Sequence, residues 1–274
     1  MLLTIDVGNT NTVFGLYEGT EMRGSFRIST NASSTSDEIG MMIMQYYHFR
    51  GYDAKDTEAV IIASVVPPVM YSLTNAIRKY CGINPVIVGE DVDVGMENRY
   101  INPREVGIDR LVNAVAATKK YGAPLIIVDI GTAITFDCID REGAYVGGAI
   151  FPGIKIAMEA LFMKASKLPR VDIVRTETAI GRTTVHSMQS GAVRGYVGAL
   201  TGIISDMKQE LADEVQVIAT GGMGRMMAEH CTLIDAVEPN LTLEGLRQIY
   251  EQNKQFFEDR RFAGCGVVEA TEEG

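Results

Sequence analysis

The stretch Met1–Gly15, MLLTIDVGNTNTVFG, decides the fold of this chain. The run from Leu2 to Ile5 predicts a short buried strand, and a second apolar run begins at Val13. A buried strand, a tight polar turn and a returning strand form a β-hairpin. Because Asp6 at the end of the first strand is costly to desolvate alone, the sequence indicates a metal ion or a charged ligand beside it.

The turn of this hairpin has the composition of an anion-binding loop. Gly8 allows the backbone to turn tightly, and the residues from Asn9 to Thr12 offer backbone and side-chain donors to a bound anion. The same residue types are also common in ordinary polar hairpin turns. The hairpin alone therefore leaves phosphate binding and a plain turn open as alternatives.

The hairpin pattern occurs a second time. Residues 125–136, LIIVDIGTAITF, align with residues 2–13 at a fixed offset of 123 positions. The matched pairs are Asp6 with Asp129, Gly8 with Gly131, Asn9 with Thr132, and Thr12 with Thr135. We interpret the repeat as an internal duplication that gave two similar domains.

The elements expected around the two hairpins form one kind of unit twice. The first copy continues with a strand at 21–29, a helix at 36–49, a strand at 59–63, a helix at 67–80 and a strand at 85–88. After a helix at 103–121 and the second hairpin come a strand at 144–150, a helix ending near 164, a helix at 185–212, a strand at 215–219, a helix near 224 and a final helix at 241–257. This order predicts two mixed α/β domains, 1–118 and 119–262, followed by a tail at 263–274 that we expect to be frayed.

Composition narrows the class of protein. Of 274 residues, 46% are hydrophobic and 22% charged, which is typical of a soluble globular protein. The net charge of −10 argues against nucleic acid or an anionic membrane as a partner. The N-terminus has no basic segment, and no apolar run approaches the about 20 residues of a membrane span, so we expect no signal peptide and no membrane helix.

The cysteines and histidines do not indicate a metal centre. The four cysteines are widely spaced without a CxxC pair, and the three histidines have no metal-ligand spacing. The cysteines are Cys81, Cys138, Cys231 and Cys265, and the histidines are His48, His186 and His230. This usage predicts reduced thiols in a cytoplasmic protein.

Two further segments are candidates for chemistry. Asp109 and Arg110 stand side by side near a helix start, where a carboxylate and a guanidinium form either a solvated surface pair or a base and a cation for phosphoryl transfer. The turn 220–222, Thr-Gly-Gly, follows a late strand and would let the backbone approach an adenosine, although such turns are often only turns. P-loop and dinucleotide fingerprints are absent from the sequence.

The helix at 185–212 carries four glycines on one face, at spacings of four, three and four residues. They are Gly191, Gly195, Gly198 and Gly202. Because each glycine costs a helix about 1 kcal/mol relative to alanine, the stripe predicts a close approach by another element. The sheet of the same domain and a second copy of the chain are the two candidates, and we favour the sheet.

Four segments together resemble the type III pantothenate kinase family, also called the Bvg accessory factor family. They are DVGNTNTVFGLY from Asp6, NPREVGIDR from Asn102, DIGTAITFD from Asp129 and GRTTVHSMQSG from Gly181. The resemblance covers roughly residues 1–262. The repeated Asp-x-Gly alone marks only the broader actin, sugar-kinase and heat-shock-chaperone superfamily, whereas the Gly-x-Asp-Arg segment makes the resemblance specific.

The resemblance implies a fold, an activity and roles for residues. The fold is α/β, with two duplicated ribonuclease H-like domains and mixed five-stranded sheets of the actin-like ATPase superfamily. The activity is ATP-dependent phosphorylation of pantothenate to 4′-phosphopantothenate, the first step of coenzyme A biosynthesis, by a homodimer that needs Mg²⁺ and a monovalent cation, K⁺ or NH₄⁺. Asp109 would be the general base, Asp129 would bind the monovalent cation, and Asp6 would lie near magnesium without ligating it directly. The residues expected to bind ATP are Asp6, Val7, Gly8, Asn9, Thr10, Asn11, Thr12, Val13 and Thr132, and those expected to bind pantothenate are Tyr100, Gly107, Ile108, Asp109, Arg110 and Thr184.

Two other classes of function remain as alternatives from the sequence. One is another enzyme of the superfamily, such as a sugar or acetate kinase or a polyphosphate hydrolase. The other is an ATP-binding regulatory protein. A chaperone is disfavoured, because 274 residues leave no room for both an ATPase domain of that kind and a peptide-binding domain.

Overall fold

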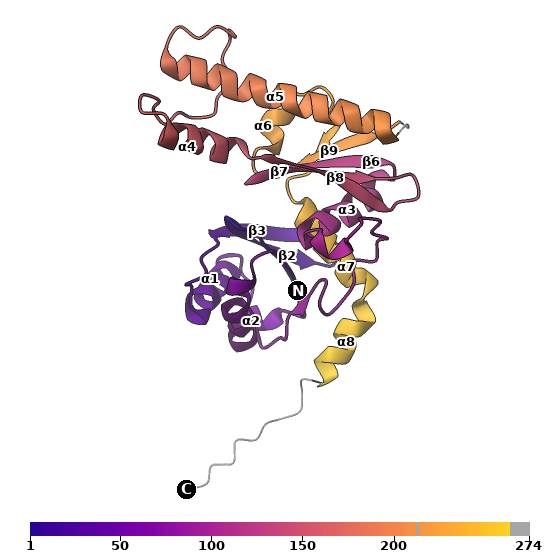
Figure 1. Cartoon of the computed structure of the whole chain (residues 1–274). Coiled ribbons are helices and arrows are strands. Elements are labelled where there is room, and N and C mark those ends of the chain that lie inside the picture. The colour runs from indigo at the N-terminus through magenta and orange to yellow at the C-terminus, as the bar shows by residue number, and fades with distance from the viewer. Residues whose placement is uncertain (212–213, 264–274) are drawn as a thin grey trace. The chain divides into compact units, whose positions relative to one another are not determined.

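The computed structural model of the chain describes residues 1–211 and 214–263 (Figure 1). It divides into two compact units: Met1–Gly95 with Thr242–Gly274 (unit 1), and Met96–Leu241 (unit 2). These bounds differ from the domain ranges expected from the repeat, because helix α3 (Ile108–Tyr121) packs against the second sheet. The ranges 1–118 and 119–262 remain a prediction about the two copies of the repeat.

Unit 1 contains the first five-stranded sheet, in the order β3-β2-β1-β4-β5. The strands are β1 (Leu2–Val7), β2 (Asn11–Glu18), β3 (Glu21–Ser29), β4 (Ala59–Ser64) and β5 (Val86–Ile87), and the helices are α1 (Ser36–Phe49), α2 (Pro67–Cys81), α7 (Leu241–Gln252) and α8 (Lys254–Ala263). β1 is antiparallel to β2 and parallel to β4, so the sheet is mixed as expected.

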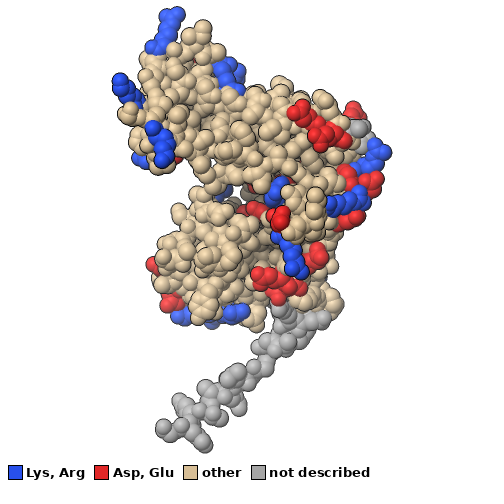
Figure 2. Space-filling view, in the orientation of Figure 1, with Lys and Arg blue, Asp and Glu red and all other residues tan. Residues whose placement is uncertain are grey.

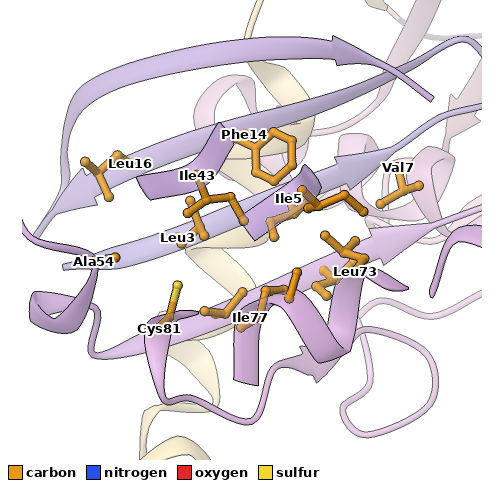
Figure 3. Packing of buried hydrophobic residues seen from close by; sticks show 14 of the residues in the cluster. Leu3, Ile5, Val7, Phe14, Leu16, Ile43, Ala54, Leu73, Ile77 and Cys81 are labelled. Carbon is orange, nitrogen blue, oxygen red and sulfur yellow. The ribbon is translucent and has the colours of Figure 1, made fainter. Parts of the chain in front are cut away.

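The core of unit 1 lies between this sheet and helices α1 and α2 (Figure 3). Alternate residues of β1, among them Leu3 and Ile5, point from the sheet toward Ile43 of α1 and Leu73 of α2 (Figure 3). On the sheet's other side, Gly15 of β2 lies against Leu243 of α7. Helices on both faces bury every residue of β1 except Asp6, which is partly exposed, and this explains the nearly continuous apolar sequence of the strand.

Unit 2 repeats the arrangement, with the sheet order β10-β9-β6-β7-β8. The strands are β6 (Leu125–Ile130), β7 (Ala133–Ile139), β8 (Tyr145–Pro152), β9 (Gln216–Thr220) and β10 (Ala236–Val237), and the helices besides α3 are α4 (Ile154–Lys164), α5 (Thr184–Leu211) and α6 (Gly224–Ala228). Ile126, Val128 and Ile130 of β6 join the core that contains side chains of α4, α5 and α6. Helix α3 packs on β6 and β7.

The two hairpins match less simply than the fixed offset predicts. In the first hairpin Asp6 pairs with Val13, whereas in the second Asp129 pairs with Thr135. The second turn is therefore one residue shorter, and the offset falls from 123 to 122 on the returning strand. The predicted match of Thr12 with Thr135 is wrong, because Thr12 corresponds to buried Ile134.

The remaining elements agree with the expected order, with three differences. The short strand β10, which pairs with β9, was not expected. The expected helix at 103–121 is a short 3₁₀ turn (Pro103–Glu105) followed by α3. The expected final helix is two helices, α7 and α8, which are separated at Asn253. There the side-chain Nδ2 donates to the Ile249 carbonyl at 2.8 Å, a local bond of the kind that competes with helix continuation.

Three cysteines, Cys81, Cys138 and Cys231, are buried and free, and Cys265 lies outside the described residues with most of the acidic tail. Among the described helices, none is both long and apolar enough to cross a membrane.

Candidate active site

The start of helix α3 presents the predicted base. Gly107 is the N-cap residue of α3, and Asp109 stands in its first turn. Asp109 Oδ1 accepts a hydrogen bond from the Arg110 backbone N–H at 2.9 Å. A Cβ on Gly107 would lie 2.5 Å from that oxygen, so glycine is what lets the carboxylate fold back on the helix end. Burial raises the pKa of Asp109, and the positive charge of Arg110 opposes the shift.

Arg110 turns inward from α3 and pairs with a carboxylate of the sheet. Its Nε donates to Oδ1 of Asp137 on β7 at 2.7 Å, and the Asp137 side chain is completely buried. The Tyr145 hydroxyl donates to the same oxygen at 2.9 Å, and the Thr135 hydroxyl donates to Oδ2 at 3.0 Å. The alternative of a solvated surface pair between Asp109 and Arg110 is therefore wrong for Arg110, because its ion pair is buried and is made with Asp137.

The carboxylate of Asp129, at the end of β6, lies against the backbone at Gly131 and Gly221, and we call these two positions the glycine cradle. A Cβ on Gly221 would collide with Asp129 Oδ1, and one on Gly131 would lie 3.5 Å from it. Gly221 has φ +83°, which favours glycine on its own account. The backbone of the 220–222 turn thus approaches Asp129; its predicted contact with adenosine remains a prediction.

The charge around Asp129 is unbalanced. The described side-chain hydrogen bond to it comes from Asn113 Nδ2 on α3, at 3.4 Å to Oδ2. Burial, together with the nearby carboxylates of Asp109 and Asp137, raises the pKa of Asp129 to about 7. Arg110 interacts with the carboxylates of Asp109 and Asp137, which in turn lie near Asp129, so a cation bound at Asp129 would offset the negative charge that the three carboxylates bring together.

Within residues 1–211 and 214–258, no three His, Cys, Asp or Glu side chains are grouped to hold a metal ion. The oxygen that lies closest to the glycine cradle is Asp129 Oδ1.

Tyr100 stands beside the Arg110 group. Its ring centroid is 6.4 Å from that of Tyr145. A Cβ on Gly147, which has φ +138°, would lie 3.8 Å from the Tyr100 ring, so the ring lies close to the backbone of β8 at this glycine. The next residue, Gly148, has a similar relation to Arg110, whose NH2 would lie 3.2 Å from a Cβ at that position.

The two hairpin turns are each tied to a following segment. In unit 1, the Thr30 hydroxyl donates to the Gly8 carbonyl at 2.6 Å and contacts the Thr12 hydroxyl at 3.0 Å. In unit 2, the Gly153 N–H donates to the Thr132 carbonyl at 3.1 Å, and a Cβ on Gly153 would collide with that oxygen. Both turns are thus held in shape by hydrogen bonds to a segment that follows them in the chain.

The predicted site residues fall into four sets. Unit 2 brings together Tyr100, Gly107, Ile108, Asp109, Arg110 and Asp129. Thr132 is exposed in the turn of the second hairpin, also in unit 2. Asp6 to Val13 belong to unit 1. Thr184 is exposed at the first residue of α5, and within the described residues no hydrogen bond or ion pair joins it to the other predicted site residues.

Sequence reasoning missed several residues of this group. Asp137 and Asn113 were given no role, nor was Tyr145. The signal for Asp137 was available, since a lone carboxylate interrupts the apolar run Ile134–Ile139 and a buried carboxylate needs a partner. The partner itself could not be identified, because Arg110 lies 27 positions away along the chain.

The fold and the site define a class of protein. Two mixed sheets of the same topology, each carrying an Asp-Gly hairpin, form the duplicated ribonuclease H-like fold of actin-like ATPases and sugar kinases. A protein titled as a putative Baf family transcriptional activator from Campylobacter jejuni is similar over 92% of this chain and 99% of its own, with TM-score 0.61 and 20% identity. The activator of 2-hydroxyisocaproyl-CoA dehydratase from Clostridium difficile, solved with bound ADPNP, is similar over 99% of each chain, with TM-score 0.51 and 14% identity.

Sequence comparison gives the family. Residues 2–206 match the family model described as Type III pantothenate kinase. A protein of Geobacillus kaustophilus (strain HTA426) named Type III pantothenate kinase is 49% identical over 255 residues, 93% of this chain and 99% of that protein. The chain belongs to the type III pantothenate kinase family and is an enzyme of the kinase class. The expected family, fold class and type of enzyme are confirmed. Membership in this kinase family implies that ATP is the phosphate donor and that it is used with a divalent metal ion.

Proposed function

We propose that the chain transfers the γ-phosphoryl group of ATP to the primary hydroxyl of pantothenate, with Asp109 as the general base. The hydroxyl oxygen forms a bond to the γ-phosphorus, and the bond from that phosphorus to the β,γ-bridging oxygen breaks. Asp109 takes the hydroxyl proton, and the electron pair leaves on ADP. The products are 4′-phosphopantothenate and ADP, so this is the first step of coenzyme A biosynthesis.

The carrying observation is the Asp109 carboxylate at the start of α3. It is partly buried, and this burial raises its pKa, which makes it a better proton acceptor than a surface carboxylate. Arg110, the next residue, supplies positive charge in the same place. A free alkoxide is too basic to form readily at neutral pH, so the hydroxyl proton would transfer late in the reaction. Positioning of the reactants and the charge of the cations would supply most of the rate acceleration.

The two hairpins would bind the donor. The turn from Asp6 to Val13 would hold the ATP phosphates through its backbone N–H groups and hydroxyls, and Thr132 would contact ATP from the second hairpin. Magnesium usually takes one or two carboxylates together with phosphate oxygens and waters, and Asp6 would act on it through such a water.

The acceptor would be held by residues of unit 2. The proposed contacts with pantothenate are Tyr100, Gly107, Ile108, Asp109, Arg110 and Thr184. Tyr100 and Arg110 support this proposal most directly, since they line one stretch of β8 at Gly147 and Gly148. Thr184 is proposed from the family resemblance alone.

We also propose a monovalent cation, K⁺ or NH₄⁺, at Asp129. The glycine cradle around Oδ1 and the excess of carboxylates over guanidinium support it. A monovalent ion would add positive charge near the reacting phosphoryl group in a hairpin turn that has no lysine or arginine of its own.

A homodimer is the third proposal, and the open glycine stripe of α5 supports it. Nothing described lies within 4 Å of a Cβ built on Gly191, Gly195, Gly198 or Gly202, so the expected packing of the stripe on its own sheet is wrong. Apolar side chains are also exposed on α4, including Ile156 and Met163. On the face shown in Figure 2, uncharged residues cover most of the surface over α4 and α5. A second copy of the chain would bury this surface.

We propose the cytoplasm as the compartment, because three free, buried cysteines suit a reducing environment.

The overall proposal is tested by ADP release. We expect ADP to form at millimolar ATP when pantothenate is added, and faster in potassium than in sodium salts. Reactions without pantothenate give the background ATPase rate. No pantothenate-dependent ADP in either potassium or ammonium salts would contradict the proposal, and equal rates in potassium and sodium would remove the cation from it.

The dimer is tested by the Gly198→Leu variant. A bulky side chain in the middle of the stripe should convert a dimer to a monomer, measured by sedimentation velocity. In a monomeric protein the same change would instead raise the melting temperature, because leucine favours a helix by several tenths of a kcal/mol or more over glycine. Gln45→Leu, on the exposed side of α1, is the control for added apolar surface and should leave the dimer intact. A wild-type monomer, or a dimeric Gly198→Leu variant, would contradict the proposal.

A further inference from the structure

The inference concerns the buried carboxylate of Asp137. Three donors from three elements converge on it: Arg110 Nε from α3 at 2.7 Å, the Tyr145 hydroxyl from β8 at 2.9 Å and the Thr135 hydroxyl of β7 at 3.0 Å. The side chain of Asp137 has no exposed surface. Asp137 therefore cannot contact a substrate directly, but it is connected to a residue that can.

The guanidinium of Arg110 is confined on more than one side. Its Cζ lies 5.8 Å from the centroid of the Tyr145 ring, which is the distance of a cation–π contact. Its NH2 lies next to Gly148, where a Cβ would stand only 3.2 Å away. Tyr145 thus acts twice, since its ring contacts the guanidinium and its hydroxyl holds Asp137.

The bond to Asp137 uses the Nε–H of Arg110, and the terminal nitrogens NH1 and NH2 are not part of it. An arginine presents its five N–H donors in a rigid plane, so fixing Nε fixes the direction of the other four. The terminal pair of nitrogens matches a carboxylate in a two-bond arrangement. Pantothenate carries one carboxylate, which gives Arg110 an anionic partner.

A purely stabilising role does not account for this pair. Buried ion pairs are often no better for stability than apolar residues of the same size, because both charges must be desolvated. The pair instead restricts a long side chain that could otherwise adopt many conformations. Holding a binding group in one geometry before the substrate arrives lowers the cost of binding.

We infer that Asp137, together with Tyr145, is a positioning residue that fixes Arg110 so that its terminal nitrogens bind the carboxylate of pantothenate. The inference rests on the proposed role of Arg110 in holding pantothenate. It extends the acceptor site to two residues that do not touch the acceptor.

The first test is the Asp137→Asn variant, which keeps the size of the side chain and removes its charge. We expect the KM for pantothenate to rise about 10-fold or more, while the KM for ATP stays within about 2-fold of the wild-type value. Tyr145→Phe keeps the ring and removes only the hydroxyl, so a smaller rise of about 3-fold is expected. If Asp137→Asn does not fold, Tyr145→Phe carries the test, because it leaves the ion pair in place.

A double variant separates positioning from a general effect on structure. If Asp137 acts only through Arg110, then Arg110→Gln/Asp137→Asn should have a pantothenate KM within about 2-fold of that of Arg110→Gln alone. Glu159→Gln changes an exposed carboxylate that pairs with Arg170 in the same unit, and this control should leave both KM values unchanged. Thermal melting of each variant checks the fold.

The outcomes separate the two levels of proposal. Additive effects in the double variant, an equal rise in both KM values, or wild-type kinetics for Asp137→Asn and Tyr145→Phe would overturn the inference. If Arg110→Gln itself leaves the pantothenate KM unchanged, the proposed role of Arg110 fails first. If Arg110→Gln raises that KM and Asp137→Asn does not, only the positioning role fails.

Discussion

The Asp109→Asn variant is expected to lose about 10²–10⁴-fold in kcat while its melting temperature and ATP affinity stay close to those of the wild type. Asparagine has nearly the same shape, and its side-chain oxygen can still accept the Arg110 backbone N–H that Asp109 accepts at 2.9 Å. It cannot take a proton from a hydroxyl group. The measurement is steady-state ADP release with pantothenate, together with ATP binding by titration calorimetry.

The size of the loss in kcat distinguishes a general base from a carboxylate that has no catalytic role. Asp172→Asn makes the same chemical change at an exposed position of the same unit and should leave kcat unaltered. Because burial raises the pKa of Asp109, kcat of the wild type should fall as the pH drops through that pKa, and the protonated form should be inactive. An Asp109→Asn variant with near wild-type turnover would show that the carboxylate is only structural.

The Asp129→Ala variant is expected to lose the response to potassium altogether. In the wild type, kcat/KM should be higher in potassium chloride than in sodium chloride, and in the variant both salts should give one rate, at least about 10-fold below the wild type in potassium. Asp172→Ala removes an exposed carboxylate of the same unit and should retain the potassium response. A variant that still distinguishes potassium from sodium would place the cation elsewhere.

The pH dependence of potassium activation adds a second readout at this site. With no cation bound, burial and the neighbouring carboxylates raise the pKa of Asp129 to about 7. A proton and a cation would then compete for the same oxygens. The potassium concentration that gives half-maximal activation should therefore rise as the pH falls below about 7. If that concentration stayed constant from about pH 6 to about pH 8, roughly one unit on either side of the pKa, the result would argue against competition between the proton and the cation.

Most strands were predictable from the sequence, but the two-residue strand β10 and the order of the strands in each sheet were not. Both β1 and β6 are bounded by a charged or polar turn and are apolar nearly throughout, because helices cover both faces. The end of the chain was harder, because the pattern at 241–257 continues through Asn253 as an unbroken helix would. The break between α7 and α8 falls at Asn253, whose side chain and backbone N–H both donate to the Ile249 carbonyl.

The candidate site was predictable where the type of residue itself indicates its chemical role. Asp109 beside Arg110, and Asp129 after an apolar strand, both have side chains that need partners. Their surroundings were not predictable, since these are backbone shapes. The space around Asp129 depends on Gly221, which lies 92 positions later in the sequence. At Gly148 a Cβ would collide with the Phe136 carbonyl and would also lie 3.2 Å from Nη2 of Arg110. A glycine in a strand or a turn gives no sign of which side chain it makes room for.

The unequal turns of the two hairpins leave the facing of the returning strands unchanged. Paired residues on neighbouring antiparallel strands point to the same side, and the pair Asp129 with Thr135 takes the place of Asp6 with Val13. At the same offset of 122, Asp137 stands where the first hairpin has Gly15. After the duplication, a change of side chain and not the change of turn length thus separated the two copies at this place. A column-by-column comparison at the offset of 123 would match Asp137 with Phe14 and miss that substitution.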